Sequence, residues 1–147
     1  MAGRLDGKVA VVLGATSGMG KSTALLFARE GAKLVISGRR AGVLQELGEQ
    51  IAQETGAASL GIPCDVQDRS QVASLITAAK AHFGRIDVFV YATGANLPRR
   101  KLYELTPEAW DMMIGTNLTG AFHCTQLLLP VMREQEDGLI IYISSIA

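Results

Sequence analysis

The chain has 147 residues, of which 48% are hydrophobic and 19% are charged, as expected of one soluble globular domain over residues 1–147. Fourteen basic and fourteen acidic side chains cancel, and there is no basic run or aromatic-basic alternation, which argues against a nucleic-acid partner. No apolar run has the length of a membrane span or of a signal-peptide core, so we expect a cytoplasmic protein without a membrane partner.

Patterns typical of buried strands alternate with helical patterns along the whole chain. Strands are expected over residues 8–14, 32–38, 58–65, 85–94 and 137–145, and helices over residues 18–30, 43–54, 69–82 and 107–135. Asp68 with Gln71 three residues later predicts a capping box, Thr106 before Pro107 predicts another helix start, and a bend is expected near Gly115. Five strands with helical crossovers predict an α/β fold with a doubly wound parallel sheet.

Cysteine and histidine are sparse and scattered. Cys64 and Cys124 lie far apart without a C-x-x-C motif, so we expect buried free thiols and no metal site. His82 and His123 have no partner motif, and we expect them at the surface and at the margin of the core, respectively.

The segment after the first strand, GATSGMGKS, fits two phosphate-binding patterns. Counted from Gly14 it reads G-x-x-x-G-x-G, which is typical of a dinucleotide-binding loop. Counted from Ala15 it approaches the P-loop of an ATPase, with Lys21 at the helix start and Asp65 as a magnesium ligand. Three features favour the dinucleotide: the arginines after the second strand, the small residues Ala-Thr-Gly after the fourth, and Asn117 and Ser144-Ser145 at places where a substrate could sit.

Three glycines in this loop have separate expected roles. Gly14 permits the tight turn out of the first strand, and Gly18 and Gly20 allow close approach of the pyrophosphate and of the packed strand. The helix N-terminus adds partial positive charge. The remaining expected donors to the phosphates are backbone or hydroxyl groups of Thr16, Ser17 and Met19.

Four motifs, in this order, resemble those of the classical short-chain dehydrogenase/reductase family: GATSGMG, CDVQD, TNLTGAF and YISSIA. The resemblance runs from Leu5 to the last residue. It implies a Rossmann-type fold, a nicotinamide dinucleotide cofactor and a small-molecule carbonyl or alcohol substrate. It further implies that Asp65 and Val66 contact the adenine, that Asn117 orders a water in a proton relay, and that Ser145 hydrogen-bonds the substrate oxygen.

The end of the second strand indicates which cofactor is preferred. Members of the family that prefer NAD have an acidic residue where this chain has Gly38, and Arg39 and Arg40 follow. A carboxylate would repel a 2′-phosphate, whereas a guanidinium can bind it with two hydrogen bonds. The sequence therefore predicts NADP (NADPH), with NAD less favoured. The alternative is that both arginines are solvated side chains before a helix.

The chain departs from the family pattern at two neighbouring strand ends. Leu13 stands where the family usually has Thr, and residues 91–94, Tyr-Ala-Thr-Gly, replace Asn-Asn-Ala-Gly. An apolar contact between Leu13 and Tyr91 is expected to replace a polar pair. Tyr91, Ala92 and Gly94 are predicted to contact the cofactor.

The family also uses a Tyr followed four residues later by Lys, beyond the catalytic Ser. None of the three tyrosines here has Lys four residues on, and the sequence ends two residues after Ser145. We therefore expect the first half to two-thirds of a carbonyl/alcohol oxidoreductase, inactive as it stands; the alternative is a non-catalytic dinucleotide-binding module. Strand alternation is expected to point Ser144 away from the substrate.

The resemblance implies a homo-dimer or homo-tetramer for the complete protein. Leu118, Phe122 and Leu129 form an apolar stripe on the last predicted helix, part of which is expected to face the sheet. The last strand, LIIYIS, is expected to be an exposed apolar edge, so residues 1–147 alone are predicted to aggregate.

Overall fold

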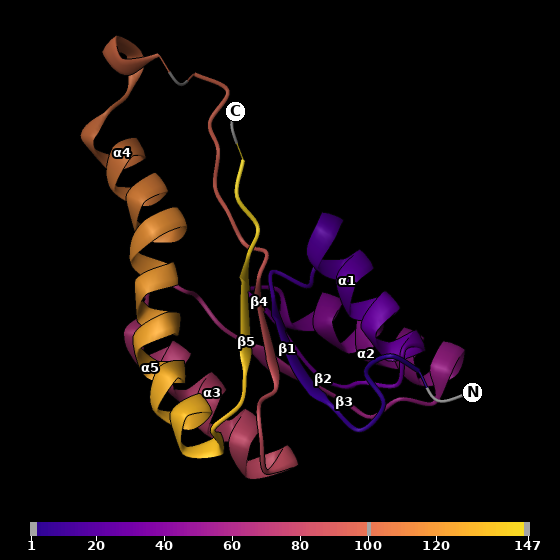
Figure 1. Ribbon diagram of the computed structural model, residues 1–147. Coiled ribbons are helices and arrows are strands. Elements are labelled where there is room, and N and C mark those ends of the chain that lie inside the picture. The colour runs from indigo at the N-terminus through magenta and orange to yellow at the C-terminus, as the bar shows by residue number, and fades with distance from the viewer. Residues whose placement is uncertain (1–2, 100, 146–147) are drawn as a thin grey trace.

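A computed structural model describes residues 3–99 and 101–145 of the chain (Figure 1). The last two residues of the YISSIA motif lie outside the described residues. The elements, in chain order, are β1 (Val9–Leu13), α1 (Gly18–Arg29), β2 (Lys33–Gly38), α2 (Ala41–Thr55), β3 (Ser59–Pro63), α3 (Arg69–Phe83), β4 (Val88–Tyr91), the 3-10 helix η1 (Leu102–Glu104), α4 (Pro107–Ile114), the π-helix η2 (Gly115–Thr119), α5 (Gly120–Gln135) and β5 (Leu139–Tyr142).

The five strands form one parallel sheet in the order β3-β2-β1-β4-β5, which confirms the predicted Rossmann-type doubly wound fold. Helices α1 and α2 cover one face, and α3 and α5 cover the other (Figure 1). The strand order reverses direction between β1 and β4. In open parallel sheets a crevice opens beside such a reversal, at the carboxyl ends of the strands.

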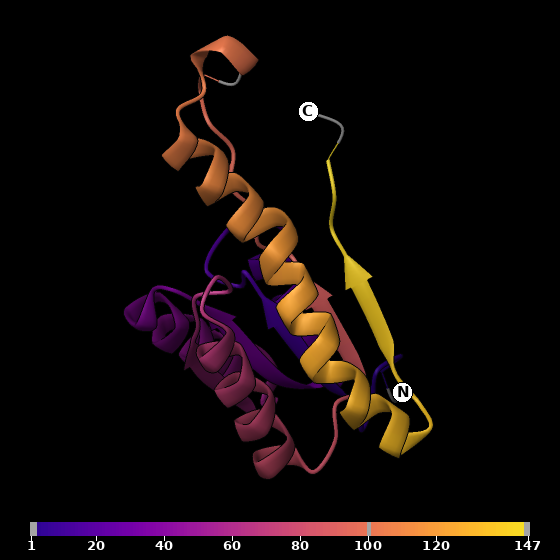
Figure 2. The same cartoon turned by 90° about the vertical axis from the view of Figure 1, so that its left-hand side faces the viewer.

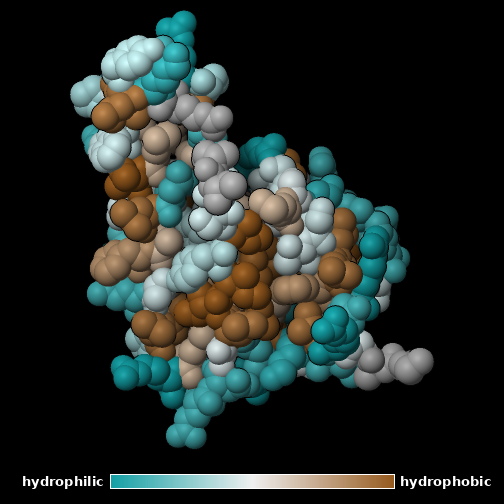
Figure 3. All heavy atoms as spheres, turned by 45° about the horizontal axis from the view of Figure 1, so that its top comes forward, coloured by the Kyte–Doolittle hydropathy of each residue, from teal (hydrophilic) through white to brown (hydrophobic). Residues whose placement is uncertain are grey.

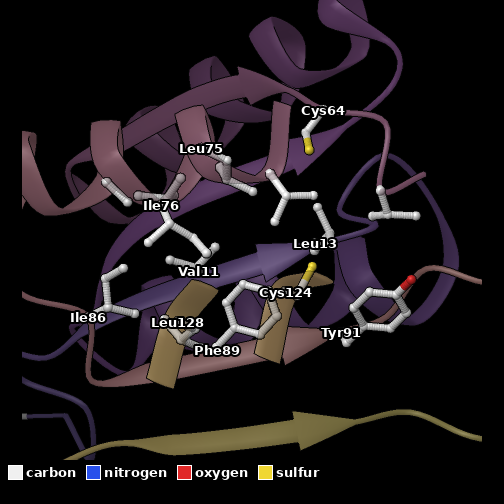
Figure 4. Packing of buried hydrophobic residues seen from close by; sticks show 14 of the residues in the cluster. Val11, Leu13, Cys64, Leu75, Ile76, Ile86, Phe89, Tyr91, Cys124 and Leu128 are labelled. Carbon is white, nitrogen blue, oxygen red and sulfur yellow. The ribbon is translucent and has the colours of Figure 1, made fainter. Parts of the chain in front are cut away.

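Each face of β1 contributes to its own core cluster. Val11 and Leu13 pack with α3 and α5, whereas Ala10 and Val12 pack with α1 and α2. Figure 4 shows the first of these clusters, with Phe89 of β4 beside Val11. A strand buried on both faces must be apolar at every position, which is why its sequence is a continuous apolar run rather than an alternating one.

Most predicted helix ends agree with the structure. Asp68 accepts hydrogen bonds from the backbone N–H groups of Ser70 and Gln71, and α3 ends at Gly84 in the left-handed conformation. The predicted capping box is wrong in one detail: the backbone N–H of Asp68 donates to the carbonyl oxygen of Asp65 rather than to the Gln71 side chain. The side-chain oxygen of Gln71 accepts from the backbone N–H of Asp65, at 2.9 Å, and the side-chain N–H of Gln71 donates to the Asp68 carboxylate.

Helices α4 and α5 are joined by η2 into one long rod that extends beyond the carboxyl end of the sheet (Figures 1 and 2). Thr106 caps the rod through the N–H of Ala109, as predicted. Where a bend was expected near Gly115, the structure has the π-helix η2. Short π-helical segments inside α-helices are frequent at functional sites.

The edge strand β5 leaves apolar surface exposed. Leu139 is 54% exposed, and Figure 3 shows apolar surface gathered between the long rod and α1, where β5 runs in Figure 1. Leu118, Phe122 and Leu129 are also exposed, whereas Leu128 is buried, so the stripe faces the sheet only in part. The oligomeric state and the aggregation of residues 1–147 remain predictions.

Candidate functional site

A first hollow of about 630 Å³ opens at the carboxyl ends of β1, β2 and β4. Most of the predicted cofactor residues come together there. It is lined by Leu13, Gly14, Thr16, Ser17, Gly18, Met19, Gly38, Arg39, Arg40, Cys64, Asp65, Val66, Ala92, Thr93, Gly94, Ala95, Met112 and Thr116. Gly20 and Tyr91 were predicted for this group and do not line it.

The loop from β1 to α1 needs its glycines for close backbone approach. Gly14 has a φ of +87°, and a Cβ there would lie 2.7 Å from the backbone of Ala92 and Thr93 at the end of β4. A Cβ on Gly20 would overlap the carbonyl oxygen of Gly14. Gly20 therefore acts behind the loop, by letting α1 pack against it, rather than in the hollow.

The N-terminus of α1 faces this hollow without a side-chain cap. Ser17 is the N-cap residue, but its side chain makes no capping hydrogen bond, and the first turn contains no acidic residue. Gly18 has a φ of +52°, and a Cβ there would meet nothing within 4 Å, so the space in front of it is open. Free N–H groups at a helix N-terminus are suited to binding an anion.

Two arginines follow β2 at the same hollow. The Arg40 guanidinium donates to the carbonyl oxygen of Thr16 at 3.1 Å, which ties it to the glycine loop. The Arg39 side chain is exposed and has no hydrogen-bond or ion-pair partner among the described residues. A Cβ on Gly38 would lie 2.8 Å from the Thr16 methyl group, so glycine is needed there for the loop and β2 to approach.

Asp65 has a local role as well as a place in the hollow. One of its carboxylate oxygens accepts from the backbone N–H of Gln67 at 3.0 Å, which stabilises the turn before α3. Its contact with an adenine remains a prediction. The neighbouring Cys64 is buried, and burial raises the pKa of its thiol to about 11. Cys64 and Cys124 are both free and buried, as predicted.

A second hollow of about 650 Å³ adjoins the first and shares Met19 and residues 92–95 with it. It is lined by Met19, Tyr91, Ala92, Thr93, Gly94, Ala95, Asn96, Met113, Asn117, Ala121, Tyr142, Ile143, Ser144 and Ser145. None of these side chains is charged at neutral pH. Ser144 and Ser145 both line it, so the lining does not separate the two, and the expectation that Ser144 points away from the substrate stays a prediction. Strand β5 ends at Tyr142, and its alternation does not extend to them.

Asn117 lies in the π-helix and is hydrogen-bonded to Ala95. Because Ala95 lines both hollows, we call it the wall between them. Its side-chain oxygen accepts from the N–H of Ala95 at 2.8 Å, and its side-chain N–H donates to the carbonyl oxygen of Ala95 at 2.9 Å. Both bonds fix the chain that leaves β4. The predicted role of Asn117 in a proton relay remains a prediction.

Tyr91 points into the core rather than into the first hollow. It is 3% exposed and pairs in register with Leu13, and both belong to one apolar cluster, as expected from the two departures. Its hydroxyl donates to the carbonyl oxygen of Thr116 in η2. Burial raises the pKa of Tyr91 above its ordinary value, so this hydroxyl stays protonated.

Sequence reasoning missed Met112, Met113 and Thr116. These residues line the hollows because the rod crosses the ends of the strands. Met113 lies four residues before Asn117 and therefore on the same helix face, which was the available signal. His82 is exposed and His123 is half-buried against the carbonyl oxygen of Val66, as predicted.

Lys21, the lysine of the P-loop interpretation, does not line the first hollow. Within residues 3–99 and 101–145 no group of three or more His, Cys, Asp and Glu side chains is placed to hold a metal ion. No helix in the same residues is long and apolar enough to cross a membrane.

Comparison with known proteins decides between the two interpretations of the loop. The family model described as short chain dehydrogenase matches residues 8–147, and the chain belongs to this family. An uncharacterized oxidoreductase of Staphylococcus aureus (strain USA300) is 38% identical over 143 residues, which are 97% of this chain and 60% of that protein. The chain thus spans about 60% of the length of the curated relatives it matches. The P-loop ATPase interpretation is wrong.

Two solved structures share the fold closely. A metagenomic short-chain oxidoreductase in complex with NADP is 31% identical, with a TM-score of 0.91 over 97% of this chain and 64% of that one. A 7α-hydroxysteroid dehydrogenase complexed with NADH and 7-oxo glycochenodeoxycholic acid is 30% identical, with a TM-score of 0.91 over 97% of this chain and 55% of that one.

Proposed function

We propose that this chain is the cofactor-binding part of an NADP-dependent oxidoreductase that interconverts a carbonyl and an alcohol. The observation that carries the proposal is the first hollow, which combines an uncapped helix N-terminus with two arginine side chains. The backbone N–H groups at this N-terminus and the two guanidinium groups can donate hydrogen bonds to the phosphates of a dinucleotide. The glycine loop also leaves open space in front of Gly18, where a phosphate could approach the backbone.

The preference for NADPH rests on Arg39 and Arg40. Arg39 is available to a 2′-phosphate, whereas Arg40 already binds Thr16 and can hold the loop in place. A charge-assisted pair with the phosphate contributes about 1.5–3 kcal/mol, on the order of tenfold to a hundredfold in affinity. One structural neighbour is complexed with NADP and the other with NADH, so the relatives support both dinucleotides.

The second hollow is proposed to hold the substrate. Bound NADPH would supply the hydride. The Ser145 hydroxyl would donate a hydrogen bond to the substrate oxygen, and Asn117 would keep the wall at Ala95 in place. In this family a Tyr exchanges a proton with the substrate, and a Lys lowers the pKa of that Tyr. Neither has a match among these residues, so the catalytic step is proposed for a longer protein that contains them.

Cofactor titration of the longer protein that contains residues 1–147 tests the proposal. We expect NADPH to bind more tightly than NADH, and Arg39→Ala to weaken NADPH binding about tenfold to a hundredfold while changing NADH binding little. Arg133→Ala is the matched control, because Arg133 is an exposed arginine on α5 that lines neither hollow. Equal affinity of the unmodified chain for the two cofactors would contradict the preference, and no binding of either would contradict the function.

The rival, a non-catalytic module that only binds the dinucleotide, makes the same titration prediction. Carbonyl-reductase activity of the longer protein separates the two. Assembly as a homo-dimer or homo-tetramer and a cytoplasmic location are part of the same proposal.

A further inference from the structure

Two tyrosines at the ends of neighbouring strands attach to the long helical rod. Tyr91 of β4 and Tyr142 of β5 are partners in register, and their ring centroids are 6.0 Å apart. The Tyr91 hydroxyl donates to the carbonyl oxygen of Thr116, and the Tyr142 hydroxyl forms a hydrogen bond with the hydroxyl of Thr125. The sheet is therefore tied to the rod at two points, one in η2 and one in α5.

The rod has a glycine where the Tyr91 hydroxyl meets it. A Cβ on Gly120 would lie 2.6 Å from that hydroxyl oxygen and 2.7 Å from a methyl carbon of Val66. Any larger residue at position 120 would require the Tyr91 hydroxyl, Val66 or the rod itself to shift. The Tyr91 side chain on the strand thus occupies the space that the absence of a side chain at Gly120 leaves on the helix, and we call this the fitted contact.

This contact holds the residue that precedes Asn117. Thr116 is fixed on two sides, because its carbonyl oxygen accepts from Tyr91 and its hydroxyl accepts from the side-chain N–H of Gln67 at 3.2 Å. A π-helical turn departs from the regular pattern of backbone hydrogen bonds, so it depends on such outside partners. Once Thr116 is fixed, the direction of the Asn117 side chain is set.

We propose that Tyr91 is a positioning residue for the wall between the two hollows. Its hydroxyl fixes the π-helix, the π-helix aims Asn117, and Asn117 holds both backbone polar groups of Ala95. Ala95 lines both hollows, so the contact buried in the core controls where cofactor and substrate meet. The statement about cofactor rests on the proposed function, whereas the statement about Ala95 does not.

Amide hydrogen exchange of the cofactor-free longer protein that contains these residues tests the core of the proposal. Tyr91→Phe removes only the hydroxyl and keeps the buried ring. We expect the Ala95 N–H, which donates to Asn117, to exchange about fivefold to tenfold faster, the effect of losing one hydrogen bond. The Ala92 N–H, which donates to Leu13, should keep its rate. Tyr103→Phe is the matched control, because Tyr103 is 80% exposed.

The outcomes separate positioning from a general effect on stability. If Ala95 keeps its exchange rate in Tyr91→Phe, or if Ala92 accelerates in step with Ala95, the proposal is overturned. Gly120→Ala gives a second route to the same displacement, and it should accelerate Ala95 without removing any polar group from the strand. An unchanged Ala95 rate in that variant would also count against the fitted contact.

NADPH titration tests the link to cofactor. Tyr91→Phe should weaken NADPH binding severalfold, while Tyr103→Phe leaves it unchanged. If the Ala95 N–H exchanges faster in Tyr91→Phe but NADPH affinity does not change, the proposed link between the fitted contact and the cofactor is wrong. If the unmodified chain does not bind NADPH at all, the proposed function fails, and the exchange result still decides the role of Tyr91 at Ala95.

Discussion

The two hollows are built in different ways. The first is lined mainly by the glycine loop between β1 and α1 and by residues that follow β2, β3 and β4, with Met112 and Thr116 contributed by the rod. The second depends on side chains that meet only after the rod has packed across the sheet, such as Asn117 and Tyr142. A glycine loop is specified by residues close together in sequence. A site made by packing is specified by contacts between residues far apart, and it is correspondingly harder to predict.

Gly14→Val should have the largest effect, because it adds a side chain where the glycine loop packs against the end of β4. The new side chain would sit at a φ of +87° with its Cβ 2.7 Å from the backbone at the end of β4. We expect a loss of more than about 3 kcal/mol in unfolding free energy, or failure to fold, together with loss of NADPH binding. Urea unfolding and cofactor titration measure both.

Gly18→Ala is the matched control for this prediction. Gly18 also has a positive φ, of +52°, but a Cβ there meets nothing within 4 Å. Its cost should be that of the conformation alone, about 1–2 kcal/mol. If the two variants were equally stable, close packing of the loop against β4 would not be what requires Gly14.

The fold and the first hollow were largely predictable. The five strands and four crossovers follow from apolar runs and helical spacing, and the glycine loop and Arg39 are local motifs. The second hollow was predicted only in part. Asn117 and Ser145 were named through family resemblance, and strand alternation cannot separate Ser144 from Ser145 because β5 ends at Tyr142. Nothing local in the sequence shows that the Tyr91 hydroxyl would meet Thr116, which is 25 residues away.

Ser145→Ala tests the second hollow, in a longer protein that contains the Tyr-x-x-x-Lys segment. Removing the hydroxyl leaves the substrate oxygen without one donor, and we expect a loss of about a hundredfold in kcat/KM, similar to the loss of one oxyanion donor. NADPH affinity should stay unchanged, because Ser145 does not line the first hollow. Ser144→Ala is the control. Its larger effect would show that the two serines have been assigned the wrong way round.

The smallest effect is expected at the opposite end of the sheet, where neither hollow is involved. The Asp87 carboxylate is buried, accepts from the backbone N–H of Val9 at 2.8 Å, and pairs with Arg85 and Lys8. Burial opposes its ionisation, but hydrogen bonds from Arg85 and Val9 and the charges of Arg85 and Lys8 outweigh burial and hold its pKa below the ordinary value.

A carboxylate with a lowered pKa in the folded state stabilises the protein above its unfolded pKa of about 3.9, and this stability is lost as the pH falls through the folded pKa. Asp87→Asn should therefore lower the unfolding free energy by about 1–2 kcal/mol at pH 7, since both cationic partners are half exposed to solvent and screened. The difference between variant and unmodified chain should shrink as the pH falls below the unfolded pKa of about 3.9 and through the lower pKa of folded Asp87. Urea unfolding at pH 7 and pH 3 measures it, with the exposed Asp137→Asn as a control expected to change little. NADPH affinity should be unchanged at pH 7, and a loss there would show that the first hollow depends on the far end of the sheet as well as on its own backbone.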